Sequence, residues 1–144
     1  MSLNTTWSYF DHNATTPVAE ELLHELPNWL KSWGNPSSIH QSGRAPKNLI
    51  RDSRQAVAQF LGVSPLEIIF NSGASEGNNT VVKGLFECLL TGVTSKTRNE
   101  FMCSQVEHPS VIKAYRYIEA RGAKVHWIPV SIEGALDLDF FKTH

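Results

Sequence analysis

Short apolar runs and helix-spaced apolar stripes follow one another in the second half of the chain. Residues 67–70, 101–106 and 124–130 are apolar runs that predict buried strands. Apolar residues recur at helical spacing between them, at 81–90 and 109–121. The order strand–helix–strand–helix–strand predicts an α/β fold with a mostly parallel sheet and right-handed crossovers.

Two helices are expected ahead of this α/β order. Thr16-Pro17 predicts a helix start, because threonine caps helices and proline is tolerated at the first helical position. Pro27 lies inside the apolar stripe that follows, which predicts a kink or two shorter helices. The second helix is expected over residues 45–61, where Gly62 ends it.

The last residues predict a helix that has only just begun, with Asp137 as its cap. A three-stranded parallel sheet would leave apolar faces and at least one strand edge poorly covered. We therefore expect the 144 residues to be part of a larger protein.

Composition excludes several classes of protein. The net charge of −1 lacks the basic excess of a nucleic-acid-binding protein. No apolar run approaches the roughly 20 residues of a membrane span, and the N-terminus does not resemble a signal peptide. Cys88 and Cys103 do not form a disulfide framework, so a reducing, cytoplasmic location is expected. Six scattered histidines show no ligand spacing, and no metal site is expected.

A turn of small residues, 71–79, joins the first predicted strand to the first helix of the α/β order. Such a turn leaves backbone N–H groups free at the positive end of the helix dipole, which favours a phosphate. The candidate ligands are the backbone of Ala74 and Ser75 and the Ser75 hydroxyl. The Gly-Lys-Ser/Thr of a Walker loop is absent. A capped turn without a ligand is the alternative.

His108 follows the second predicted strand and precedes Pro109, which disfavours a helical backbone at the histidine. The imidazole is therefore expected near the carboxyl end of a strand, where open α/β sheets bind ligands. A purely structural histidine is the alternative.

Four motifs follow one another along the chain: Tyr9-Phe10-Asp11-His12-Asn13-Ala14-Thr15-Thr16-Pro17, Gly34-Asn35-Pro36-Ser37-Ser38-Ile39-His40 with Gly43-Arg44, Ile69-Phe70-Asn71-Ser72-Gly73-Ala74-Ser75-Glu76-Gly77-Asn78-Asn79, and Glu107-His108-Pro109-Ser110-Val111. In these motifs and their order the chain resembles the cysteine desulfurases, a family of class V, fold-type I pyridoxal-phosphate (PLP) enzymes. The departures are His12, where many members have asparagine, Ser75 in place of threonine, and Gly77 in place of alanine.

The resemblance implies the first part of a fold-type I large domain at residues 35–144, truncated at its C-terminal end, after an N-terminal arm and helix at residues 1–34. It implies that His108 is catalytic, stacks on the PLP ring and can transfer protons. It assigns the remaining site residues to the cofactor phosphate (Gly73, Ala74, Ser75) and, near the active-site entrance, to the substrate side (Asn13, Ala14, Thr15, His40).

The activity implied by the resemblance is conversion of L-cysteine to L-alanine, with the sulfur passed to an enzyme cysteine as a persulfide. A homodimer, a sulfur-acceptor protein and a place in iron–sulfur cluster assembly are implied in the same way. The family's Schiff-base lysine follows a Ser-x-His sequence, and no lysine does so here. Neither Cys88 nor Cys103 resembles the family's nucleophilic cysteine, which lies on a mobile loop. The 144 residues alone are therefore expected to be inactive.

Two alternatives remain open at this point. Another class V PLP enzyme, such as a selenocysteine lyase, an aminotransferase or an epimerase-like enzyme, would share these motifs. A catalytically inactive fragment that serves as a binding module would also carry them.

Overall fold

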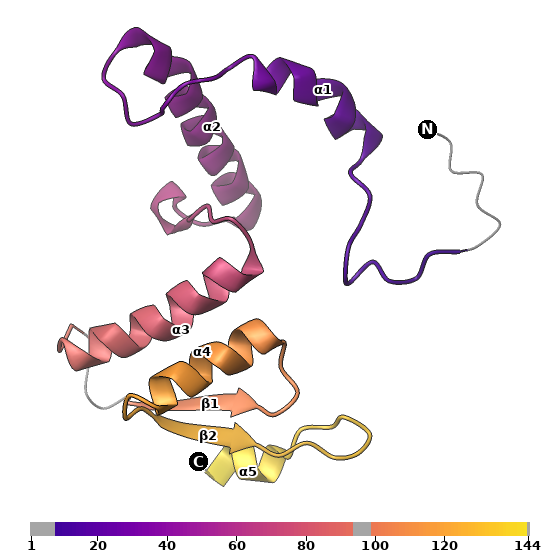
Figure 1. Cartoon of the computed structure of the whole chain (residues 1–144), viewed down its shortest axis with the longest axis vertical. Coiled ribbons are helices and arrows are strands. Elements are labelled where there is room, and N and C mark those ends of the chain that lie inside the picture. The colour runs from indigo at the N-terminus through magenta and orange to yellow at the C-terminus, as the bar shows by residue number, and fades with distance from the viewer. Residues whose placement is uncertain (1–7, 94–98, 144) are drawn as a thin grey trace. The chain divides into compact units, whose positions relative to one another are not determined.

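The computed structural model describes residues 8–93 and 99–143 of the chain. The chain divides into two compact units, Met1–Ile68 and Ile69–His144, which we call the first and the second unit (Figure 1). The domain boundary expected at residue 34 stays a prediction. Among the described residues, no helix combines the length and the apolar character needed to cross a bilayer.

The first helix differs from its prediction at its start. Helix α1 spans Glu20–Leu30, and Ala19 precedes it without a side-chain cap. The predicted cap at Thr16-Pro17 is wrong, because the Thr16 hydroxyl donates to the His12 carbonyl (3.2 Å) within a turn. The two-piece alternative is also wrong: α1 is one helix with Pro27 inside it. Proline removes a single backbone hydrogen bond there, and the helix continues for one more turn.

The bounds of helix α2 agree with the predicted range to within one residue. It spans Arg44–Leu61 and ends at Gly62, whose left-handed backbone (φ 69°) lets its N–H reach the carbonyls of the last turn. A short 3-10 helix, Gln41–Gly43, precedes it. Gly43 is buried, and a Cβ there would lie 2.6 Å from the Ser38 carbonyl oxygen and 2.7 Å from that of Asn35. The glycine in this motif is therefore required by the close approach of two backbone segments.

The strand predicted at residues 67–70 is absent from the structure. Pro65–Glu67 forms a 3-10 helix instead, and residues 68–70 belong to neither of the two strands of the described sheet. Local hydrogen bonds explain the difference: the Ser64 hydroxyl accepts from the Leu66 N–H (3.3 Å), and the Glu67 carboxylate accepts from the Ser64 N–H (2.8 Å). A strand also needs a neighbour for its backbone groups, and apolar composition alone does not supply one.

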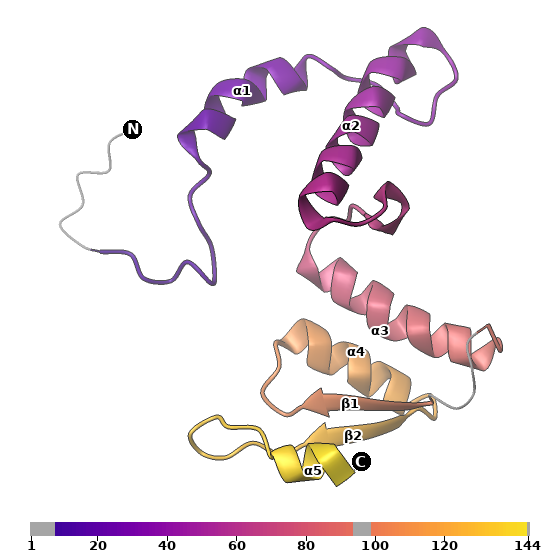
Figure 2. The same ribbon diagram turned by 180° about the vertical axis from the view of Figure 1, so that it is seen from behind.

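The second unit contains the α/β arrangement. Helix α3 (Ala74–Leu90) is followed by strand β1 (Glu100–Ser104), helix α4 (Pro109–Glu119) and strand β2 (Lys124–Ile128). The two strands are parallel, with Glu100 opposite Lys124, and α4 is the crossover between them (Figures 1 and 2). The α/β prediction is confirmed for this part. A short helix, α5 (Leu138–Thr143), ends the described chain, and the Asp137 carboxylate caps it as predicted.

The core of the second unit lies between α3, α4 and the sheet. Val82 and Phe86 of α3 pack against Ala114 and Ile118 of α4, and Ile118 is fully buried. Phe101 of β1 closes this cluster from the sheet side, with its ring 6.4 Å from that of Phe86. Helices α3 and α4 therefore lie side by side, and both begin at the end where β1 finishes (Figures 1 and 2).

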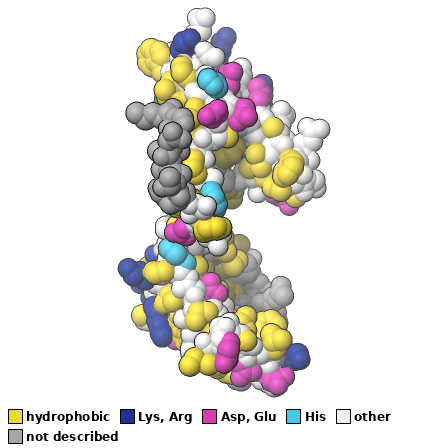
Figure 3. All heavy atoms as spheres, turned by 90° about the vertical axis from the view of Figure 1, so that its right-hand side faces the viewer, with side chains coloured by type: hydrophobic (Ala, Val, Ile, Leu, Met, Phe, Trp, Pro, Cys, Tyr) yellow, Lys and Arg dark blue, Asp and Glu magenta, His cyan; other side chains and the backbone are white. Residues whose placement is uncertain are grey.

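Large hydrophobic side chains also reach the surface of both units (Figure 3). Ile39 in the first unit is 97% exposed, and Ile132 in the second unit is 99% exposed. The buried positions of the first unit are few: of residues 8–68, Gly43, Pro46 and Ala58 are the ones classed as buried.

Candidate functional site

The turn before α3 is held by its own side chains. Gly73 adopts a positive φ of 153°, a conformation that favours glycine, and its N–H donates to Asn71 Oδ1 (2.9 Å). The Ser72 N–H donates to Glu76 Oε2 (2.7 Å). Hydrogen bonding from Ser72, by its side chain and then by its backbone, holds the pKa of Glu76 below its usual value. The turn is thus fixed in shape while the first N–H groups of the helix stay unused.

The first turn of α3 presents donors that have no acceptor within the described residues. These donors are the backbone N–H groups of Ala74, Ser75 and Glu76 and the Ser75 hydroxyl, and all three residues are exposed. The first intrahelical bond is made only by the N–H of Gly77, to the Gly73 carbonyl (3.1 Å). A helix start of this kind attracts an anion through its N–H groups and its dipole. This donor set fits the phosphate ester of PLP that the family resemblance implies.

The beginning of α4 places His108 as predicted. The histidine is the residue before the helix, with an extended backbone (φ −57°, ψ 145°), and Pro109 takes the first helical position. The loop after β1 is fixed by Ser104, which is buried and donates to the Glu107 carboxylate (2.7 Å). His108 itself is exposed. The imidazole therefore lies at the carboxyl end of β1 and is open to a ligand.

One hydrogen bond joins the two helix beginnings across 32 residues of sequence. Asn78 Nδ2 in the first turns of α3 donates to Ser110 Oγ (2.9 Å), and Ser110 Oγ lies 2.8 Å from His108 Nδ1. The predicted phosphate turn and the predicted stacking histidine thus belong to one end of one compact unit. This is the arrangement that a ligand with an anionic end and a flat ring would require.

The residues expected on the substrate side lie in the first unit. Ala14 and Thr15 donate from their backbone N–H groups to the Asp11 carbonyl (3.1 and 3.3 Å), so residues 11–15 form a turn that includes Asn13. His40 is exposed, with Nδ1 2.7 Å from the Ser42 hydroxyl. These contacts explain the local structure, and the part of these four residues in the site stays a prediction.

The two cysteines differ in their surroundings. Cys103 lies buried in β1, and burial, with the nearby Glu107 carboxylate as a second cause, raises the pKa of its thiol to about 11. Cys88 is half-buried on α3. A thiol attacks as its thiolate, so Cys103 is a poor candidate for a nucleophile. The expectation that Cys103 is not the catalytic cysteine agrees with this environment.

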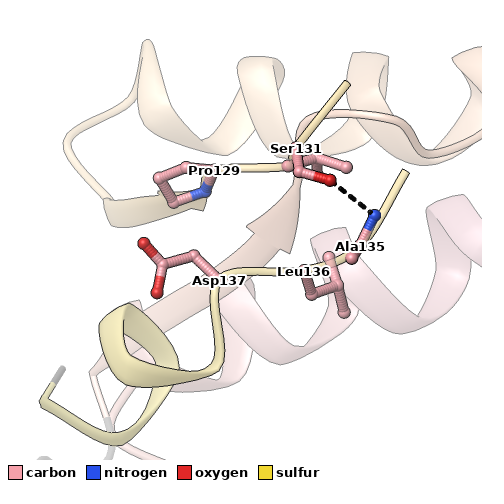
Figure 4. Close-up of a pocket in the computed structure, with 6 residues that line it drawn as sticks. Pro129, Ser131, Ala135, Leu136 and Asp137 are labelled. Atoms are coloured by element: carbon pink, nitrogen blue, oxygen red, sulfur yellow. Dashed lines mark hydrogen bonds between the residues drawn. The ribbon is translucent and has the colours of Figure 1, made fainter. Parts of the chain in front are cut away.

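The pocket drawn in Figure 4 lies elsewhere in the second unit, after β2, and is lined by residues 129–131 and 135–137. Its polar groups serve the local structure: the Ala135 N–H donates to the Ser131 hydroxyl (3.3 Å), and Asp137 caps α5. None of the residues predicted for the site lines it. The pocket is formed by the loop that connects β2 to α5, and it contributes no chemistry to the candidate site.

Ser104, Asn78 and Ser110 were not identified as site residues from the sequence. Nothing in the sequence links Asn78 to Ser110, 32 positions later. Glu107 was recognised as part of a motif without a role. The missing information is the tertiary packing of α3 against α4, which local patterns do not contain.

Comparison with known proteins agrees with the motifs. The chain is 36% identical over 135 residues to "Cysteine desulfurase IscS" of Dictyoglomus turgidum, an alignment that covers 93% of this chain and 33% of that protein. The solved structure of a NifS-like protein superposes with a TM-score of 0.77 and 33% identity, covering 94% of this chain and 36% of its own. A structure titled "SspA in complex with cysteine" gives a TM-score of 0.73 at 34% identity, over 86% and 35% of the two chains.

The chain thus spans about a third of the length of the relatives that it matches. The NifS-like likeness confirms the fold class as a piece of a fold-type I structure. The family model for aminotransferase class-V matches residues 8–144, which is nearly the whole chain. The chain therefore belongs to the aminotransferase class-V family.

Proposed function

We propose that the intact protein is a PLP-dependent cysteine desulfurase, which converts L-cysteine to L-alanine and passes the sulfur to an enzyme cysteine as a persulfide. Support comes from relatives named cysteine desulfurase and from the similar protein solved with cysteine. The observation that carries the proposal is the pair of helix beginnings, one with free N–H donors and one with an exposed histidine, joined by the Asn78–Ser110 hydrogen bond.

The phosphate is assigned to the start of α3. The N–H groups of Ala74 and Ser75 and the Ser75 hydroxyl bind its oxygens, and Gly73 allows the turn that exposes them. A hydrogen bond to a charged group contributes about 1.5–3 kcal/mol, and the helix dipole adds about 0.3–1 kcal/mol. A few such contacts are enough to retain a cofactor.

His108 is assigned to the face of the cofactor ring. Stacking of aromatic rings contributes about 0.5–1.5 kcal/mol beyond the area that they bury. The cofactor, when bound, supplies an electron sink for the carbanion chemistry of an amino acid. Within that chemistry His108 orients the ring and holds or moves a proton at Nε2, the nitrogen that faces away from Ser110.

The remaining assignments rest on the resemblance. We place Asn13, Ala14, Thr15 and His40 on the substrate side. We also expect a homodimer in the cytoplasm that delivers sulfur to an acceptor protein, with iron–sulfur cluster assembly as the process served.

The test of the site is retention of PLP by single-residue variants of the intact protein. Ser75→Ala removes one charge-assisted donor and should weaken PLP binding by roughly tenfold or more. Thr80→Ala is the matched control, because Thr80 is an exposed hydroxyl residue of the same helix whose bond goes to the Glu76 carbonyl (2.8 Å). Equal dissociation constants for Ser75→Ala and the wild type would overturn the phosphate assignment.

Two substitutions of His108 separate its two roles. His108→Ala should lose both cofactor retention and turnover. His108→Phe keeps an aromatic face but no proton-bearing nitrogen, so it should retain PLP and lose about 100-fold or more in turnover. Unchanged turnover in His108→Phe would remove proton transfer from the assignment.

The reaction itself is tested by substrate choice. The intact protein should release alanine from L-cysteine. L-selenocysteine and amino-group acceptors, the substrates of related class V enzymes, are assayed beside it. Alanine formation from L-selenocysteine alone would favour a lyase instead. The 144 residues expressed by themselves should form no alanine and no borohydride-trapped lysine–PLP bond, and a trapped lysine in this segment would contradict that expectation.

A further inference from the structure

We infer that Asn78 and Ser110 act as positioning residues for His108, fixing the plane of its imidazole and its neutral tautomer before a ligand arrives. The inference rests on the proposed function for its consequence, the stacking of His108 on a cofactor ring. Its structural part stands on three hydrogen-bond distances and is testable in the absence of any cofactor.

A backbone N–H can only donate, so the N–H of Ser110 fixes the directions of the other hydrogen bonds. The Ser110 backbone N–H donates to His108 Nδ1 (3.1 Å), so Nδ1 carries no proton in this arrangement. An unprotonated ring nitrogen can only accept, so the Ser110 hydroxyl, 2.8 Å away, donates to the same nitrogen and shares its single lone pair with the N–H. The Asn78 amide donates to Ser110 Oγ (2.9 Å) and leaves the hydroxyl hydrogen free to point at the ring.

This chain of donors determines which nitrogen of His108 faces a ligand. With Nδ1 accepting, the neutral ring bears its proton on Nε2, because the hydrogen bond at one nitrogen sets the state of the other. A half-turn of the ring would put a carbon in place of Nδ1 and lose both bonds from Ser110. The imidazole is thereby held in one orientation although His108 is exposed.

Asn78 links the orientation of the His108 ring to helix α3. Its position, four residues after Ala74, lies on the helix whose first turn is the candidate phosphate site. Any shift of that helix start relative to α4 would lengthen the Asn78–Ser110 bond. The two residues thus keep the anion-binding end and the stacking ring in register, a spacing that a rigid cofactor requires.

The experiment is NMR of the intact protein with ring-¹⁵N histidine, first without and then with PLP. We expect one neutral tautomer of His108, protonated at Nε2, with Nδ1 in the hydrogen-bonded range. Ser110→Ala should move the Nδ1 resonance toward that of a free ring nitrogen, and Ser110→Thr, which keeps the hydroxyl, should restore it. Asn78→Ala should produce part of the same shift although Asn78 does not touch the ring. Asn79→Ala is the matched control, because the hydrogen bond of the Asn79 amide among the described residues stays within α3, to the Ser75 carbonyl (2.8 Å).

The accompanying loss of PLP affinity should be roughly twofold to tenfold for Ser110→Ala and for Asn78→Ala, the size of one neutral hydrogen bond. The visible circular dichroism of bound PLP should also fall in these two variants at equal occupancy. An unchanged Nδ1 resonance in Ser110→Ala overturns the inference, and so does an equal shift in Asn78→Ala and Asn79→Ala. If the ring signals respond as expected but no variant or wild-type protein takes up PLP, the hydrogen-bond chain stands and the proposed function is wrong.

Discussion

The two units of the chain are held together by different kinds of contact. The second unit has an apolar core of side chains from α3, α4 and β1, with Ile118 fully buried. In the first unit, Gly43, Pro46 and Ala58 are the buried positions among residues 8–68, and its loops are fixed by turns and backbone contacts. The first unit therefore depends on backbone geometry and the second on side-chain packing.

This difference bears on where chemistry can be held precisely. A packed core holds its elements in fixed relative positions, because close-packed interiors have low compressibility and transmit strain. The Asn78–Ser110–His108 contacts lie at the end of that core. The residues of the first unit that are predicted for the substrate side lie instead on a turn and a loop.

The largest expected difference between the two units comes from replacing one isoleucine by alanine in each of them. Ile118→Ala should lower the free energy of unfolding by about 2–5 kcal/mol, because it empties a fully buried position. Ile39→Ala, at a residue 97% exposed in the first unit, should change it by less than about 0.5 kcal/mol. Chemical denaturation of both variants measures the difference, and similar losses would contradict the contrast between the units.

A second pair uses glycine to sharpen the comparison. Gly43→Ala in the first unit should destabilise by roughly 1–3 kcal/mol, because its Cβ would meet backbone oxygens at 2.6 and 2.7 Å. Gly84→Ala in α3 has no atom within 4 Å of the new Cβ and should stabilise by about 0.5–1 kcal/mol. Thermal unfolding midpoints should therefore move in opposite directions, and a neutral Gly43→Ala would show that backbone packing does not hold the first unit.

Acid should affect the second unit through Glu100. Hydrogen bonds from Lys124 and then from His126 hold the pKa of Glu100 below its ordinary value of 4.5. A carboxylate with a lowered folded-state pKa stabilises the protein above its unfolded-state pKa, and this contribution is lost as the pH falls through the folded-state value. The melting temperature of Glu100→Gln should thus lie slightly below that of the wild type at pH 7, and the gap should close as the pH falls below 4.5. A gap between Glu100→Gln and the wild type that stays constant as the pH falls from 7 through the acid range would mean that the contacts of Glu100 with Lys124 and His126 carry no pH-dependent stability.

The smallest expected effect concerns the buried thiol. With a pKa raised to about 11, only about one Cys103 thiol in a thousand is ionised at pH 8. An alkylating reagent should therefore modify Cys88 first and reach Cys103 only after unfolding. Peptide mass spectrometry distinguishes the two sites, and rapid labelling of Cys103 in the folded protein would contradict its burial in β1.

Local patterns predicted most of the elements. Helices α2, α3 and α4 and both strands appear where apolar spacing and glycine stops placed them. Two predicted features are wrong, each because a local hydrogen bond competes. The Thr16 hydroxyl bonds within a turn instead of capping a helix, and a capping box at Ser64 favours a 3-10 helix where the strand at 67–70 was expected to begin. Neither competitor is visible in hydrophobic periodicity.

The candidate site was predictable only as separate motifs. The small residues before α3 and the His108-Pro109 pair each indicated their local conformation, and the structure confirms both backbone conformations. The pairing of Asn78 with Ser110 depends on the packing of Phe86 against Ile118 several turns away, and no local rule reports it.

A crystal structure of the intact protein with PLP bound tests the central claim most directly. We predict phosphate oxygens within hydrogen-bond distance of the Ala74 and Ser75 N–H groups and of the Ser75 hydroxyl, and a pyridine ring stacked on the His108 imidazole. A cofactor phosphate held by other residues, or a ring that does not contact His108, would contradict the account.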